Sequence, residues 1–140
     1  MTSKIKLKLT FLGLLAVILA VCLGFITFFT IKTYRLSSLV KDAKTAFKQK
    51  QYDEAKQIFM RVVASDDNNE QAFVYLANIA EINNNPPEAL AYRYRALQLN
   101  QLNREYHQQY LNTLLMNRNY PAVVVELKRI RQKASPDNRP

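Results

Sequence analysis

Hydrophobic residues recur at helical spacing along most of the chain after the first 35 residues. The segment Glu70–Asn103 shows this pattern most plainly. Each half of it holds apolar or small residues three and four positions apart: Phe73, Leu76, Ala77 and Ala80, then Ala89, Leu90, Tyr92, Ala96, Leu97 and Leu99. Such spacing places these residues on one face of a helix. The polar stretch Asn83–Pro87 separates the halves, so the segment predicts two helices joined by a short turn.

The same pattern recurs on both sides of this segment at an interval of 34 residues. Positions that correspond at this interval hold Ala43, Ala77 and Leu111; Ala46, Ala80 and Leu114; Lys50, Asn84 and Arg118; Tyr52, Pro86 and Tyr120; and Ala55, Ala89 and Val123. A fixed period of this length indicates a stacked array of helix pairs. We therefore expect an all-α domain over residues 36–134, built from units 36–69, 70–103 and 104–134.

An uncharged apolar run precedes this domain. Leu9–Ile31 contains 23 residues without a charge or a proline. A helix of this length crosses the hydrocarbon core of a membrane, which is roughly 30 Å thick. The run is longer than the apolar region of a cleaved signal peptide and ends without a small-residue cleavage site. We expect an uncleaved transmembrane helix at 9–31, after a basic tail at 1–8.

The junction between the two parts contains no glycine or proline from Ile31 to Lys50. Two arrangements are compatible with this composition: the anchor continues directly into the first helix of the domain, or the chain kinks near Thr33–Ser38. We assign residues 32–35 as a short juxtamembrane link. Residues 135–140 carry the composition of a disordered tail.

Small residues form a stripe along the expected transmembrane helix. Ala16, Ala20 and Gly24 follow one another at intervals of four. Such stripes allow membrane helices to pack closely. The stripe is compatible with a homodimer or a larger membrane complex, although small residues are also common in any membrane span.

Charge and composition narrow the possible classes of function. The formal net charge is +9, and the chain has one cysteine, Cys22, and one histidine, His107. These counts exclude a disulfide framework, and the sequence contains no HExxH motif, nucleophile elbow or Gly-rich phosphate loop. We expect a protein that is not an enzyme, holds no cofactor or metal, contacts lipid through residues 9–31 and binds no nucleic acid.

The repeated unit resembles the tetratricopeptide repeat family. The match is most specific in the first unit, through Ala43-x-x-Ala46-Phe47 and Tyr52-Asp53-Glu54-Ala55, and continues in the second through Leu76-Ala77, Ala80, Glu88-Ala89-Leu90 and Ala96-Leu97. The third unit is degenerate but keeps the register, and the proline usual at the end of a repeat is Asp67 or Gln101. The resemblance implies an α-solenoid of about three helix hairpins.

This resemblance also implies a groove, lined by the first helix of each repeat, that holds a protein or peptide partner. The positions that it assigns to the groove are Lys44, Tyr75, Asn78, Glu81, Gln108 and Asn112. An asparagine offers both a donor and an acceptor to an extended peptide backbone. A carboxylate clamp for chaperone C-termini is poorly matched, because Lys44 is the single cation at the corresponding positions and Glu105 has the wrong sign.

We therefore expect a single-pass membrane scaffold that binds protein partners during assembly of a membrane or envelope complex. A small structural subunit held in a complex through its transmembrane helix is an alternative, as is a targeting receptor on an organelle surface. Lysines flank the apolar run on both sides. The difference in basic residues that sets the orientation of a membrane helix therefore nearly cancels. A short basic tail most often stays in the cytoplasm, which favours a bacterial inner membrane with the domain in the periplasm.

Overall fold

The computed structural model describes the backbone of residues 2–134 and side chains within 13–133. The described residues form six helices and no strand, so the all-α prediction is confirmed. The helices are α1 (Thr2–Lys48), α2 (Tyr52–Ser65), α3 (Glu70–Ile82), α4 (Pro86–Leu99), α5 (Arg104–Met116) and α6 (Tyr120–Ala134). The chain divides into two units, Met1–Ser38 and Leu39–Pro140, and the predicted tail at 135–140 lies outside the described residues.

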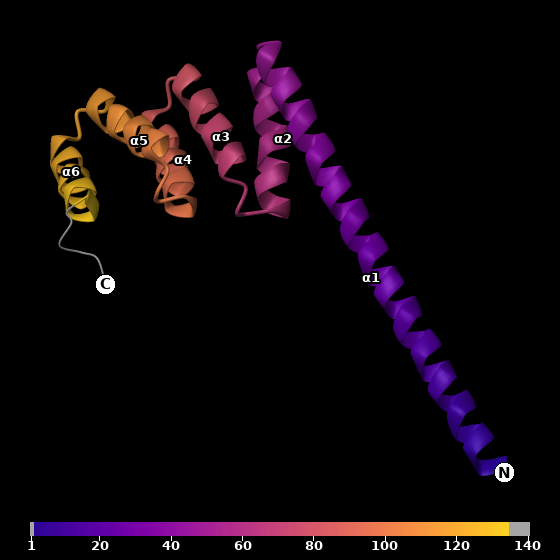
Figure 1. Ribbon diagram of the computed structural model, residues 1–140. Helices are drawn as coiled ribbons and strands as arrows, with labels where there is room; N and C mark the ends of the chain where they lie inside the picture. Colours follow the sequence, from indigo (N-terminus) through magenta and orange to yellow (C-terminus); the bar gives the residue numbers. More distant parts are fainter. Residues whose placement is uncertain (1, 135–140) are drawn as a thin grey trace. The chain divides into compact units, whose positions relative to one another are not determined.

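Helix α1 is helical without interruption from Thr2 to Lys48 (Figure 1), so residues 32–35 are part of it. Every side chain from Gly13 to Arg35 is exposed. By length and composition, α1 can cross a membrane. The hydroxyl of Thr27 donates to the carbonyl oxygen of Gly24 at 2.9 Å, which satisfies this polar group inside the helix.

The second unit contains the end of α1 and helices α2 to α6. Consecutive helices from α2 to α6 pack against one another (Figure 1). Small residues occupy the buried positions where helices approach: Ala43, Ala46, Ala55, Ala72, Ala77, Ala80, Ala89 and Ala96. The largest fully buried side chains are Phe59, Leu76, Ile79, Leu97, Leu114 and Val62. The small-residue positions that the 34-residue period predicts as core are thus buried in the first two units.

Three turns share one backbone conformation. Lys50, Asn84 and Arg118 have φ values of 62°, 52° and 54°. At each turn, the following N–H bonds to the carbonyl oxygen five residues earlier: Gln51 to Ala46 at 3.0 Å, Asn85 to Ala80 at 2.8 Å and Asn119 to Leu114 at 2.9 Å. The left-handed residue itself bonds three residues back in every case. This pair of bonds is the Schellman helix ending, so the period seen in the sequence is also present in the backbone.

Asparagine side chains cap the starts of four helices, whereas α2 begins after Gln51 without a side-chain cap. The side chains of Asn69 and Asn103 accept backbone N–H groups at the starts of α3 and α5. The side chain of Asn85 accepts the N–H of Glu88 at the start of α4, and Asn119 accepts that of Ala122 at the start of α6. Each cap satisfies donors that a helix start leaves without an intrahelical partner.

Candidate functional site

The six residues predicted to line a groove fall into three groups. Lys44 and Tyr75 form the first, since the Lys44 ammonium lies 5.9 Å from the centroid of the Tyr75 ring. The ring of Tyr75 also stacks on Phe59, with 4.8 Å between centroids, and meets the ring of Phe47 edge-on. Lys44 and Tyr75 are both half-buried. Their contacts therefore join α1, α2 and α3 within the second unit.

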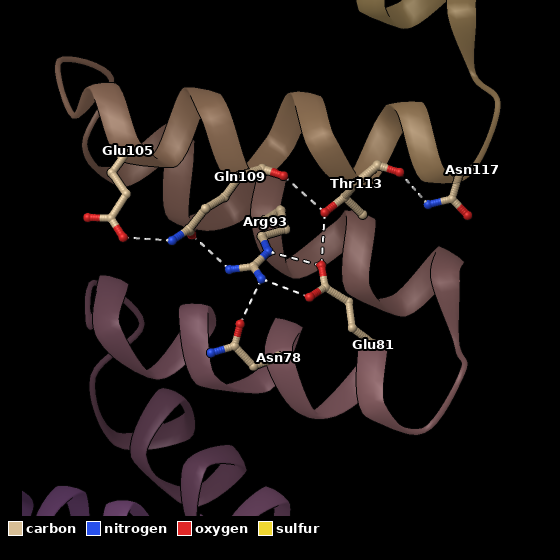
Figure 2. A network of polar contacts seen from close by, with 7 residues as sticks. All are labelled: Asn78, Glu81, Arg93, Glu105, Gln109, Thr113 and Asn117. Atoms are coloured by element: carbon tan, nitrogen blue, oxygen red, sulfur yellow. Dashed lines mark hydrogen bonds and ion pairs between the residues drawn. The ribbon is translucent and has the colours of Figure 1, made fainter.

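Asn78 and Glu81 belong to a second group, a polar cluster centred on Arg93 (Figure 2). Arg93 is only 6% exposed and extends from α4 toward α3 and α5. Its Nε and Nη2 donate to the two carboxylate oxygens of Glu81 at 3.3 and 3.0 Å. Nη2 also donates to the Asn78 side-chain oxygen, and Nη1 donates to Gln109, each at 2.7 Å. One guanidinium thus binds side chains from two neighbouring helices.

Further bonds extend this cluster along α5. The hydroxyl of Thr113 lies 2.9 Å from the Glu81 carboxylate and 3.0 Å from the carbonyl oxygen of Gln109, so its single proton serves one of the two. The Gln109 side-chain amide donates to Glu105 at 2.9 Å. The oxygens of Asn78 and Glu81 are therefore engaged inside the protein. Replacing Asn78 alters this cluster as well as the surface.

Arg93 is not among the residues that the resemblance assigns to the groove, although the sequence contains a signal for it. At the 34-residue interval its position corresponds to Phe59 and Leu127. A cation at a position that is apolar in the neighbouring units indicates a buried charge, which requires a partner. The identity of that partner follows only from the packing of α3 and α5 on α4.

Gln108 and Asn112 form the third group, on the wall of a groove between α5 and α6. We call this cavity the α5–α6 groove; its volume is about 590 Å³. Leu102, Leu111, Leu115 and Ile130 supply apolar lining, and Arg104 and Lys133 supply charge. Leu102 is 91% exposed and Leu115 is 47% exposed. The groove is thus an open surface with apolar and cationic lining.

A buried pair joins the two helices beside this groove. Nδ1 of His107 lies 2.7 Å from the carboxylate of Glu126, whose side chain is 6% exposed. The other ring nitrogen, Nε2, lies 2.9 Å from the carbonyl oxygen of Gln101. A carbonyl oxygen can only accept, so Nε2 carries a proton there. His107 therefore connects the α4–α5 turn, α5 and α6, a role that its sequence position alone did not indicate.

The pKa values of several ionisable groups are shifted by their surroundings. The hydrogen bond from Lys56 of α2 lowers the pKa of Glu88 in α4, against the opposing effect of burial. Burial raises the pKa of the Tyr106 hydroxyl in α5, and the nearby carboxylate of Glu70 in α3 adds to the shift. Burial likewise raises the pKa of Tyr110. These shifts follow from packing between layers of helices.

The Arg93 cluster and the α5–α6 groove differ in what their side chains leave open. The Arg93 cluster binds its own members, whereas the α5–α6 groove offers apolar surface and two cations to an outside molecule. Within the described part of the chain, no group of three or more His, Cys, Asp or Glu side chains could hold a metal ion. The α5–α6 groove thus combines apolar side chains with two cationic ones.

No protein-family model matches the chain, and no curated protein matches it.

Proposed function

We propose that the chain is a membrane-anchored scaffold of tetratricopeptide type that binds a protein partner. The observation that carries this proposal is the turn geometry of Lys50, Asn84 and Arg118, which repeats at 34-residue intervals with the same backbone hydrogen bonds. A regular array of helix pairs presents extended surfaces to other proteins. The open α5–α6 groove lies on one such surface.

The membrane part of the proposal depends on α1. Its apolar side chains between Gly13 and Ile31 are exposed, and its length is sufficient to span a bilayer. We place the first unit in a bacterial inner membrane and the second unit in the periplasm, because a short basic tail usually remains in the cytoplasm. A reporter that is active only in the cytoplasm, fused after Pro140, tests this orientation: inactivity is expected, and activity contradicts it.

Photo-crosslinking in native membranes tests the scaffold function. A photoreactive amino acid is placed at one of three exposed positions in the full chain: Gln57 in α2, Ala91 in α4 or Asn112 in α5. A scaffold is expected to give a discrete protein adduct from at least one position. The same experiment is repeated after residues 9–31 are replaced by an unrelated transmembrane helix.

The replacement separates the scaffold from the main alternative. A binding domain keeps its adduct when the span is exchanged, because the contact lies in the second unit. A structural subunit held through its span loses the adduct. Absence of any adduct at all three positions contradicts the scaffold proposal directly.

A further inference from the structure

The α5–α6 groove lies on a face whose counterpart one layer earlier is covered. Counting back 34 residues, Asn112 and Leu115 of the groove correspond to Asn78 and Glu81 of α3. Helix α5 covers those earlier positions, since Thr113 approaches Glu81 and Gln109 reaches Asn78 through Arg93. In the preceding layer, the face that corresponds to the α5–α6 groove is therefore covered by a helix.

The α5–α6 groove differs from the corresponding face of the preceding layer in polarity and in the sign of its charge. The earlier layer holds Glu70, Ala77 and Glu81 where the groove holds Arg104, Leu111 and Leu115. The change from Ala77 and Glu81 to leucines adds apolar surface, and the change from Glu70 to Arg104 reverses a charge. Among the residues lining the groove there is no carboxylate, whereas Arg104 and Lys133 are both cationic. A helix that covers the groove must therefore bring apolar side chains and carboxylates.

We infer that the α5–α6 groove binds an amphipathic acidic helix of a partner protein, which packs apolar side chains on Leu111, Leu115 and Ile130 and carboxylates on Arg104 and Lys133. This inference rests on the proposed scaffold function and specifies its binding surface. Helix α5, which covers the preceding layer, is 13 residues long and sets the expected length of the bound segment. Helix-in-groove binding of this kind uses anchors at intervals of three and four residues.

Charge argues against a second copy of this chain as the occupant. A symmetric contact between two α5–α6 grooves would bring Arg104 and Lys133 of one copy against the same residues of the other. Like charges opposed across an interface cost binding free energy. A foreign acidic helix meets no such repulsion, so the occupant is a partner of opposite charge.

Binding of a designed peptide tests the inference. The probe is a fluorescent, hydrocarbon-stapled helix of about 14 residues, stapled because unconstrained helices of this length are marginal in water. It carries leucines at helical spacing on one face and glutamates beside them. A matched probe has lysines in place of the glutamates. Fluorescence anisotropy is measured with the full chain in nanodiscs of zwitterionic lipid, at peptide concentrations up to about 1 mM.

The glutamate probe is expected to bind at least about tenfold more tightly than the lysine probe. Arg104→Glu should largely abolish this preference, because the new carboxylate offsets the charge of Lys133; a carboxylate is also favourable in the first turn of a helix. Leu115→Glu should weaken the glutamate probe by about tenfold or more, because it removes apolar contact and adds like charge. Arg131→Glu is the matched control: it changes the same charge at an exposed position of α6 outside the groove, and should preserve the preference.

Three results overturn the inference: equal binding of both probes, no binding at the highest concentration, or a preference that Arg104→Glu leaves unchanged. Self-association of the full chain that Leu115→Glu abolishes would also overturn it, because the groove would then hold a second copy. Circular dichroism of each variant verifies that the fold is retained. If a crosslinked partner at Gln57 or Ala91 persists while the probes fail, the scaffold function stands and the groove assignment falls.

Discussion

Arg118 repeats the left-handed backbone of Lys50, with φ values of 54° and 62°. A long side chain in this region costs roughly 1–2 kcal/mol, whereas asparagine and glycine tolerate it more readily. Asn84 occupies the corresponding place in the middle turn. The first and last turns therefore hold their Schellman bonds against local strain, and the middle turn does so at lower cost.

Glycine at the strained turns should stabilise the second unit. Lys50→Gly and Arg118→Gly are each expected to raise its free energy of unfolding by about 0.5–1 kcal/mol, after allowance for the greater freedom of glycine in the unfolded chain. Asn84→Gly should change it less. Denaturant unfolding followed by circular dichroism measures the three variants. Lys48→Gly, at the helical end of α1, is the control and should be destabilising; equal effects at all four positions would contradict the strain argument.

A double-mutant cycle at Arg93 and Glu81 should reveal strong coupling. Glu81→Leu leaves a guanidinium that is 6% exposed without its carboxylate, and is expected to destabilise by about 3–5 kcal/mol. Arg93→Leu should cost less, about 2–3 kcal/mol, because the Glu81 side chain is 31% exposed and can be hydrated. The double variant should lose less than the sum of the two, by at least about 1 kcal/mol.

Asn78→Ala serves as the reference for this cycle, because it removes one hydrogen bond and leaves the ion pair of Arg93 and Glu81 in place. It should destabilise by about 1 kcal/mol. Strictly additive losses for Arg93→Leu and Glu81→Leu in urea unfolding would show that the two side chains do not act together.

Glu88 should make the stability of the second unit depend on pH in the acid range. The hydrogen bond from Lys56 lowers the pKa of Glu88 below its ordinary value of 4.5 in the folded protein. A lowered folded pKa gives stability that is present above the ordinary value and is lost as the pH falls through the folded value. Both side chains are partly exposed, at 32% for Lys56 and 25% for Glu88, so the contribution is less than about 1 kcal/mol.

The measurement compares the wild type with Glu88→Gln at pH 7 and at successively lower pH. The variant should be the less stable at pH 7, and the difference should shrink as the Glu88 carboxylate of the wild type becomes protonated. Glu54→Gln removes an exposed carboxylate of α2 and is the control. A stability difference that stays constant down to the most acidic pH would exclude a linked role for Glu88.

The repeating part of the fold follows from the sequence because it depends on local chemistry. Alanines at fixed positions mark close helix approaches, and Ala43, Ala55 and Ala89 are all fully buried. The polar residues at each turn likewise predict where helices end. The third unit is less regular, with Leu111 half-buried and Leu127 51% exposed. Leu127 corresponds to the fully buried Phe59 of the first unit, so burial at this position does not follow from the period alone.

The polar contacts of the candidate site could not be predicted in the same way. Asn78 and Glu81 both lie on α3, but their partner Arg93 comes from α4, and Gln109 and Thr113 come from α5. Such a cluster depends on which long side chain crosses between layers. The same holds for His107, whose partner Glu126 lies 19 positions away.

Substitution of the small-residue stripe in α1 should weaken self-association in the membrane. The side chain of Ala20 is exposed, and a Cβ added at Gly24 would meet no other atom within 4 Å, so this face of the helix is open. Ala20→Ile places a branched side chain where two helices would approach, and is expected to reduce the signal of a membrane-dimerisation reporter several-fold. Val21→Ile is the control, since it enlarges an exposed side chain outside the stripe. Equal signals from the wild type and both variants would show that this stripe does not mediate association.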